Sequence, residues 1–250
     1  KKIDSIRTWE STSKDKKLQY LINRKLKRIN VSTSYFSKIK NKILKKLVKL
    51  KAEKSQFISI IDLSKQLLIL VLFDENKKLH FIGADLISSG EMQREKNIKY
   101  GENHYFDTPA SIYIAKRGWR STGDYKEDNR TQGYGQKDRY IFYFGKILAK
   151  RYNTFDKNKE KILNENDWKL VDDYFEFAMH AHEASTPKGK AYSHGCIRLT
   201  NELNIFLDNN LFLHHKSIIN NKWKHPYAQK PIDMKYKKYI GKYLIIEEKF

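Results

Sequence analysis

The segment FISIIDLSKQLLILVLFDENKKLHFIGADLISSG, residues 57–90, determines the fold class of this chain. It contains three short runs rich in Ile, Leu, Val and Phe, at about 57–62, 67–74 and 79–88, separated by the polar turns LSKQ and DENKK. Runs of this length and composition, bounded by turn residues, are typical of β-strands. The segment therefore predicts a three-stranded β-meander.

Further strand signals follow downstream. DTPASIYIAKR (107–117) predicts a strand after a proline, and DRYIFYFGK (138–146) and DDYFEFAMHAH (172–182) predict two more. KSIINNKW (216–223) and GKYLIIEEKF (241–250) have the composition of closing strands. We therefore expect one mainly β domain with short helices.

Two other segments have different signals. Residues 118–137 are polar and rich in glycine, which favours a long surface loop. A short helix is expected after the cysteine, with Thr200 or Asn201 as its cap. Its apolar face consists of Leu203, Phe206, Leu207 and Leu211.

The N-terminal region has helical periodicity. Residues 16–30 place Leu and Ile at helical spacing, STS at 32–34 offers an N-cap, and a second amphipathic helix continues to about residue 52. Each apolar face needs a partner, so this hairpin packs on itself, on the main domain or on another subunit as a homodimer. We divide the chain into a basic helical hairpin (1–54) and a β domain with a C-terminal extension (55–250).

Positive charge is concentrated in that hairpin. The chain of 250 residues has a formal charge of +21, and residues 1–54 contain 18 Lys or Arg against four acids. Such an arm suits an anionic lipid or an anionic envelope polymer, although a solvated lysine-rich face gives the same composition. The hairpin has no aromatic platform for stacking bases, so nucleic acid is not favoured. The chain begins with Lys-Lys, which is compatible with a targeting segment removed from it.

The segment MHAHEASTPKGKAYSHGCIRLT, residues 179–200, contains the single cysteine and three of the eight histidines. His180, His182, His194 and Cys196 could supply four zinc ligands, but they lack the spacing that places ligands on one scaffold. We therefore predict no metal. A buried thiol among hydrogen-bonded histidines is a second, purely structural alternative.

A nucleophile site is the third alternative. A thiol becomes a nucleophile when an imidazole takes its proton, and His180 ends an apolar run that could hold it opposite Cys196. Gly195 lets the backbone turn tightly and direct N–H groups at a bound carbonyl. Spacing alone leaves these alternatives open.

The full pattern, H-(x)12-SHGCIRL, resembles the signature of the L,D-transpeptidase catalytic-domain family. The matching residues are His180, Ser193, His194, Gly195, Cys196, Ile197 and Arg198. Upstream, the meander ending in Ser88-Ser89-Gly90 resembles the opening of that family, and DTPAS (107–111) resembles its Thr-Pro turn. The resemblance covers about residues 56–222. It implies an L,D-transpeptidase-like β-sandwich or barrel, without a cofactor, preceded here by the basic hairpin.

The resemblance also implies a reaction. Enzymes of this family act on peptidoglycan stem peptides. Cys196 would attack the carbonyl that joins the L-centre of the third-position diamino acid to the terminal D-alanine. His180 would accept the thiol proton and later protonate the leaving amine, and N–H groups at Gly195 and Cys196 would hold the oxyanion.

The other site residues have predicted roles beside these. His194 would orient the loop, and a backbone carbonyl would orient His180. Arg198 would bind a substrate carboxylate or hold the loop internally. Ser193 and His182 complete the predicted substrate contacts.

The sequence departs from the family pattern at three places. The family has His-Gly at the base, whereas His180 is followed by Ala181 and His182, so His182 is a weaker candidate for the base. Ala110 follows the Thr-Pro turn in place of glycine. The insert at 118–137 and the segment 147–170 are candidates for a lid over the substrate.

The acyl acceptor is open at this stage. An amine from a second stem gives a 3-3 cross-link, a protein amine gives wall attachment, and water gives L,D-carboxypeptidase trimming. A non-catalytic polyanion-binding protein of the envelope is the alternative from another class. The substrate class implies the periplasm or the outer face of the cytoplasmic membrane, and roles in cell wall biogenesis and cell shape.

Overall fold

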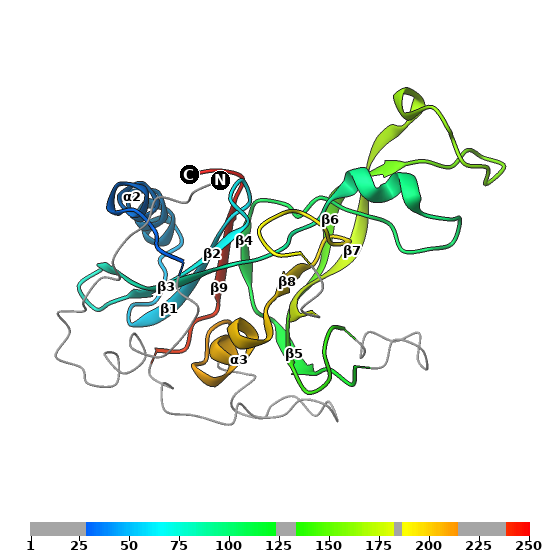
Figure 1. The fold of residues 1–250 in the computed structure, drawn as a ribbon. Coiled ribbons are helices and arrows are strands. Elements are labelled where there is room, and N and C mark those ends of the chain that lie inside the picture. The colour runs from blue at the N-terminus through cyan, green and yellow to red at the C-terminus, as the bar shows by residue number, and fades with distance from the viewer. Residues whose placement is uncertain (1–28, 124–133, 183–186, 215–238) are drawn as a thin grey trace.

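The computed structural model describes residues 29–123, 134–182, 187–214 and 239–250, and these form two mixed β-sheets with few short helices (Figure 1). Sheet A contains, in spatial order, β3 (Leu79–Leu86), β2 (Leu67–Phe73), β1 (Gln56–Asp62), β9 (Tyr243–Glu247) and β4 (Ile112–Ile114). Sheet B contains β5 (Arg117–Arg120), β6 (Tyr140–Asn153), β7 (Lys169–Ala181) and β8 (Ile197–Leu199). The predicted mainly β fold class is confirmed.

The meander β1–β3 forms as predicted, and it is largely apolar because both of its faces are buried. Phe57 and Ile61 of β1 pack into the core shared by sheets A and B. Ile58 and Ile60 point to the opposite face, into a second apolar cluster. A strand buried on both faces has a continuous apolar sequence rather than an alternating one.

Helix α2 (Thr33–Lys49) covers that second face of sheet A (Figure 1). Ser32 caps it, accepting from the N–H of Tyr35 at 3.0 Å, as the STS signal predicted. Its buried residues, Ile39, Ile43 and Leu47, join the cluster of Ile58 and Ile60. Among the alternatives for the hairpin, its second helix therefore packs on the main domain.

The first predicted helix, residues 16–30, falls mostly outside the described residues, and dimerisation stays a prediction. At the other end of the chain, β9 lies parallel to β1 and antiparallel to β4. The closing strand predicted at 241–250 is therefore confirmed, whereas the one predicted at 216–223 lies outside the described residues.

The region between β4 and β7 differs from the prediction. The run 107–117 divides between two strands, β4 and β5, which belong to different sheets. Gly118, Trp119 and Arg120, predicted as loop, pair with β6. Trp119 is only 4% exposed, and this burial outweighs the turn-forming character of its neighbours.

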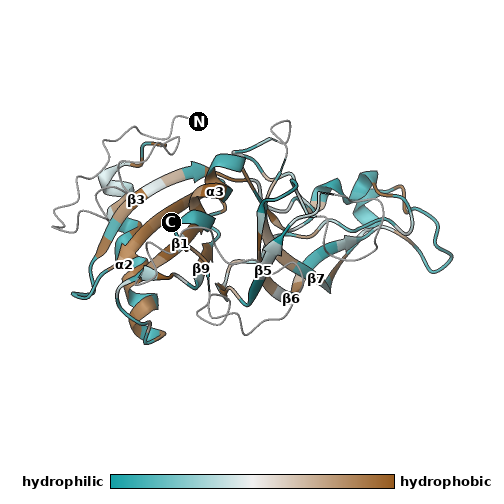
Figure 2. Ribbon diagram, turned by 90° about the horizontal axis from the view of Figure 1, so that it is seen from below, coloured by the Kyte–Doolittle hydropathy of each residue, from teal (hydrophilic) through white to brown (hydrophobic). Residues whose placement is uncertain are grey.

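In segment 147–170, a lid candidate in the sequence, the residues up to Asn153 continue β6 and pair with β7 from Lys169 onward, and residues 154–168 form the end of this hairpin. The turn of the hairpin contains a short 3-10 helix, η3 (Glu165–Asp167). Figure 2 shows that the outer end of this hairpin is largely hydrophilic, whereas the strands of sheet A are largely hydrophobic. The exposed positions of this hairpin mix charged residues with apolar ones such as Leu148, so the sequence shows neither an apolar run nor a clear alternation.

Two helices flank the nucleophile segment and the pocket. Helix α3 (Asn201–Asn209) begins after the predicted cap Thr200, which accepts from the N–H of Leu203 at 3.1 Å. The 3-10 helix η1 (Met92–Asn97) follows strand β3. Across the described part of the chain, no helix is both long and apolar enough to cross a membrane.

The packing of α2 on sheet A makes this helix part of the folded domain, so Ile43→Ala should lower the free energy of unfolding by about 2–5 kcal/mol. Ile43 is fully buried. The measurement is urea unfolding of the full chain, with the exposed Lys45→Ala on the same helix as the control. Equal stability of the two variants would show that α2 does not stabilise the β domain.

Candidate active site

The nucleophile loop, residues 192–198, is hydrogen-bonded to residues 88–91, which follow β3. The N–H of Arg198 donates to the carbonyl of Ser88 at 2.8 Å, and the N–H of Ser88 donates back to Arg198 at 3.1 Å. Two segments that are a hundred residues apart in sequence thus form one backbone ladder. The predicted Ser-x-Gly element is therefore the support of the loop that contains the cysteine.

The Thr-Pro turn joins the same contact through the hydroxyl of Thr108. This hydroxyl accepts from the N–H of Gly90 at 2.8 Å and donates to the carbonyl of Gly195 at 2.6 Å. Next to it, the N–H of Phe106 donates to the carbonyl of His194 at 3.2 Å. All three sequence motifs therefore meet at the backbone of the nucleophile loop.

Glycine is required at two positions of this contact because a side chain would not fit there. Gly195 has φ +128°, and a Cβ there would lie 2.7 Å from the ring of Phe175. A Cβ on Gly90 would lie 2.1 Å from the carbonyl oxygen of Phe106. Any larger residue at either position would displace the loop.

The strand register brings Cys196 and His180 to the same face of sheet B. β8 runs parallel to β7, with Met179 opposite Ile197 and His180 opposite Arg198. Cys196 directly precedes β8 and is therefore level with residue 178, two positions before His180. Because side chains alternate along a strand, the thiol and the imidazole project from the same side.

Both side chains line one cavity of about 520 Å³. Its walls also include the predicted site residues His182, Ser193, His194 and Arg198. Gly195, which has no side chain, forms the turn beneath them. The volume is within the usual range for a small-molecule or peptide site.

His180 is held in one tautomer by the backbone. Its Nδ1 lies 3.1 Å from the carbonyl oxygen of Ala181. A carbonyl only accepts, so Nδ1 holds the proton and Nε2 is an acceptor. Burial lowers the pKa of His180 to about 3, and the nearby charges of His182 and Arg198 act in the same direction. His180 is therefore a neutral base in the resting site.

Cys196 is a neutral thiol in the resting site. Burial raises its pKa to about 11, and the positive charge of Arg198 offsets this only in part. Its Sγ donates to the carbonyl of Glu176 at 3.4 Å. Burial thus opposes charge on both partners, so a reaction through this thiol would require proton transfer to the imidazole to accompany attack on a substrate.

Ser193 and His194 shape the nucleophile loop. The hydroxyl of Ser193 donates to the carbonyl of Cys196 at 2.5 Å and accepts from the N–H of Gly195 at 3.0 Å. That bond occupies one of the two N–H groups predicted for the oxyanion, and a substrate contact by Ser193 stays a prediction. His194 stacks on Tyr105 with ring centroids 3.9 Å apart. Burial lowers its pKa to about 4.

Arg198 and His182 both line the cavity. Arg198 donates to the carbonyl of Tyr192 at 3.4 Å while it lines the cavity. The N–H of His182 donates to the carbonyl of residue 199 at 3.1 Å, and its ring centroid is 6.1 Å from that of His180. Their substrate contacts stay predictions.

Two residues of the predicted loop 118–137 support His180, and the sequence analysis missed both. The ring of Tyr134 lies 5.6 Å from that of His180. Gly135 has φ +70°, and a Cβ there would lie 1.9 Å from the carbonyl oxygen of Ala181. The glycine content of the loop was visible in the sequence, but its position against the base was not.

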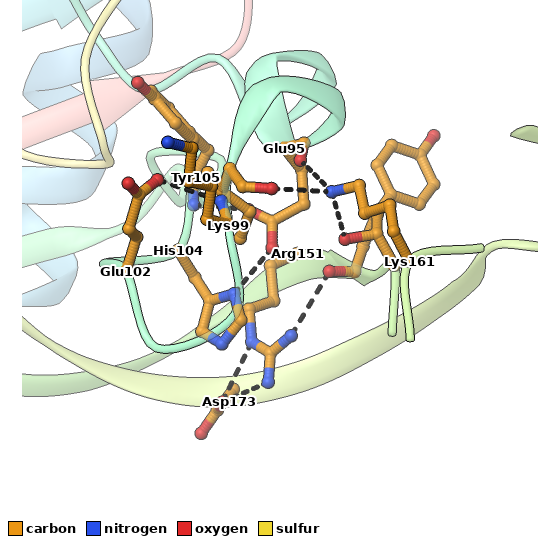
Figure 3. Close-up of polar contacts among 11 residues, drawn as sticks. Glu95, Lys99, Glu102, His104, Tyr105, Arg151, Lys161 and Asp173 are labelled. Carbon is orange, nitrogen blue, oxygen red and sulfur yellow. Dashed lines mark hydrogen bonds and ion pairs between the residues drawn. The ribbon is translucent and has the colours of Figure 1, made fainter. Parts of the chain in front are cut away.

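A polar cluster beside the cavity was also missed (Figure 3). Glu95 of η1 is fully buried and holds both His104 and the backbone of Tyr105. Arg151 of β6 holds Asp173 of β7 through two nitrogens, at 2.9 and 2.8 Å. The residues of this cluster are polar and distant in sequence, so no periodic pattern connects them.

No group of three or more His, Cys, Asp or Glu side chains within the described ranges is placed to hold a metal ion. No family model matches the chain, and no curated protein matches it. Among solved structures, the chain is similar to an L,D-transpeptidase (residues 123–326) from Xylanimonas cellulosilytica, with 14% identity and a TM-score of 0.35. The match covers 78% of this chain and 62% of that chain. This distant likeness assigns neither a reaction nor a substrate to the protein.

The neutral resting pair predicts how Cys196 reacts with iodoacetamide. Because burial raises the pKa of the thiol to about 11, the alkylation rate should rise about tenfold per pH unit from about pH 7 to about pH 10. Cys196 is the only cysteine, so mass spectrometry reports on it alone. A rate plateau near neutral pH that disappears in His180→Ala would instead demonstrate a resting thiolate–imidazolium pair.

Proposed function

We propose that this protein is a peptidoglycan L,D-transpeptidase that works through a cysteine acyl-enzyme. The observation that carries the proposal is the pairing of Cys196 with His180 in one cavity, with Nδ1 of His180 committed to the carbonyl of Ala181. This leaves Nε2 as the proton acceptor that a thiol nucleophile needs. The resemblance of the SHGC segment to the transpeptidase signature supports the substrate class.

In the proposed reaction, Cys196 attacks the carbonyl before the terminal D-alanine of a tetrapeptide stem. His180 takes the thiol proton as the C–S bond forms and gives it to the leaving amine of D-alanine. The N–H of Gly195 donates to Ser193, so we assign the oxyanion contact to the N–H of Cys196. One such donor is typically worth about 3–4 kcal/mol of transition-state stabilisation.

The positive charge of Arg198 suits the stem peptide, which contains several carboxylates. Arg198 lines the cavity, and Lys188 is close enough to influence the pKa of His180. Burial lowers the pKa of Lys188. In the proposal these cations bind substrate carboxylates, and His182 and Ser193 supply further contacts.

The cellular setting follows from the substrate class. A stem-peptide enzyme works in the periplasm or at the outer face of the cytoplasmic membrane. The lysine-rich segment 1–54 would then face anionic envelope polymers or lipid. A non-catalytic polyanion-binding protein needs neither a shaped cavity nor an oriented imidazole, and both are present.

The test is the product spectrum from purified disaccharide-tetrapeptide. We expect wild type to release D-alanine and form a cross-linked dimer, and Cys196→Ala to do neither. Liquid chromatography with mass spectrometry separates the products. Tripeptide without dimer would identify an L,D-carboxypeptidase, and intact tetrapeptide with the wild-type enzyme would contradict the proposal.

A further inference from the structure

A second oriented imidazole lines the cavity, and the mechanism above does not use it. His104 lies on the segment after η1, and its Nδ1 is 2.5 Å from Oε1 of Glu95. The other oxygen of Glu95 accepts from the N–H of Tyr105 at 2.7 Å. A buried carboxylate that fixes the tautomer of an imidazole is the arrangement of the Asp-His half of a catalytic triad.

The second ring nitrogen of His104, Nε2, is directed away from Glu95. Figure 3 shows Nδ1 turned to Glu95 and the other ring nitrogen turned away from it. The side chain is 32% exposed, whereas Glu95 is fully buried. His104 also lines the cavity that contains Cys196. An imidazole with Nδ1–H bound to a carboxylate presents Nε2 as an acceptor.

Surrounding contacts hold this pair in place. Lys161 donates to the carbonyls of Glu95 and Ile98, at 2.8 and 3.2 Å, and so ties the β6–β7 hairpin to η1. His104 is two residues before Phe106, whose N–H donates to the nucleophile loop. The imidazole therefore has a fixed position relative to the loop of Cys196.

Carboxylates lie on the cavity wall near His104. Asp173 lies close enough for the charge of His104 to influence it, and the hydrogen bonds from Arg151 lower the pKa of Asp173 despite its partial burial. Asp173 therefore stays ionised. Glu102 and Glu176 are further carboxylates on the cavity wall. Arg198 and Lys188, by contrast, influence His180. The cavity wall thus contains carboxylates, of which Asp173 lies near His104, as well as the basic Arg198.

We propose that His104, positioned by Glu95, is a second base of this site, which takes a proton from an ammonium group that serves as the acyl acceptor. This inference rests on the proposed acyl-transfer function and extends it by naming the group that deprotonates the acceptor amine. Glu95 is the positioning residue of the pair, and in the proposal the carboxylates of Glu102 and Asp173 on the cavity wall attract the ammonium group.

The transfer step removes two protons from an ammonium acceptor. An ammonium acceptor must lose two protons to become an amide nitrogen with one N–H. Nε2 of His104 takes the first proton and passes it to solvent. The amine lone pair then forms the C–N bond, the C–S bond breaks onto sulfur, and His180 moves the second proton from nitrogen to the thiolate of Cys196.

His180 is poorly suited to the first of these transfers. Burial lowers its pKa to about 3, far below the ordinary pKa of an amine, about 10. Proton transfer to so weak a base is strongly uphill, whereas a positioned base commonly contributes about 10²–10⁴-fold. The side chain of His104 is partly exposed to solvent, so it can return its proton to water.

The experiment separates acylation from transfer in His104→Gln and Glu95→Gln. Acyl-enzyme formation on disaccharide-tetrapeptide is followed by acid quench and intact mass. The acyl-enzyme is then mixed with glycinamide, an ammonium acceptor, or with hydroxylamine, which is largely uncharged at neutral pH. The matched control is His80→Gln. His80 lies on β3, outside the cavity lining, and its Nε2 is 2.7 Å from a carboxylate oxygen of Asp74.

We expect acylation in His104→Gln to stay within about twofold of wild type, and glycinamide transfer at neutral pH to fall about 10²-fold. Transfer to hydroxylamine should change little, because it needs no prior deprotonation, and glycinamide transfer should recover as rising pH deprotonates the acceptor. Glu95→Gln should show the same selective loss, smaller in size, and His80→Gln should match wild type.

Three results would overturn the proposal in different ways. Equal glycinamide transfer by wild type and His104→Gln, with normal acyl-enzyme formation, contradicts the role of His104 alone. Absence of an acyl-enzyme in wild type contradicts the proposed function itself. An equal loss with both acceptors would show that His104 only maintains the shape of the cavity.

Discussion

The buried hydroxyl of Thr108 is the contact on which the candidate site depends. It accepts from Gly90 and donates to Gly195, so it joins the end of the meander, the Thr-Pro turn and the nucleophile loop. Leaving either of those backbone groups unpaired in a buried position would cost about 1–3 kcal/mol. The two glycines allow the close approach, because a Cβ on either would meet a neighbour. Sheet A therefore fixes the loop that sheet B presents.

The chemistry of the site follows from burial. Burial raises the pKa of Cys196 and lowers that of His180, so both are uncharged at rest. A neutral thiol is protected from oxidation and from indiscriminate alkylation. In the proposed reaction, attack and proton transfer occur together on a bound carbonyl, which would restrict acylation to substrates that fit the cavity.

Much of the fold was predictable, because burial on both faces gives β1–β3 an unmistakably apolar sequence and Ser32 and Thr200 are strong caps. The SHGC segment and His180 were predictable as candidate site residues from the type and order of residues. The outer part of β6–β7 was not, since its exposed face mixes charges with apolar residues. Trp119 was missed because its strand conformation depends on pairing with β6, which the local sequence does not reveal.

The unpredicted parts of the site have a common cause. Gly135 supports His180 from a loop, and Glu95 meets His104 across nine residues of irregular chain. Neither relation has a period, so propensity and spacing give no signal for it. Hydrogen-bond partners of buried polar groups identify such residues only after the fold is known.

The central claim is that Cys196 is the nucleophile of an acyl-transfer site. Intact-mass measurement after incubation with a carbapenem, whose strained carbonyl acylates a nucleophile of this kind, tests it most directly. The account predicts one covalent adduct on wild type, located on the peptide that contains Cys196, and none on Cys196→Ala. No adduct on wild type, or an equal adduct on the alanine variant, would contradict it.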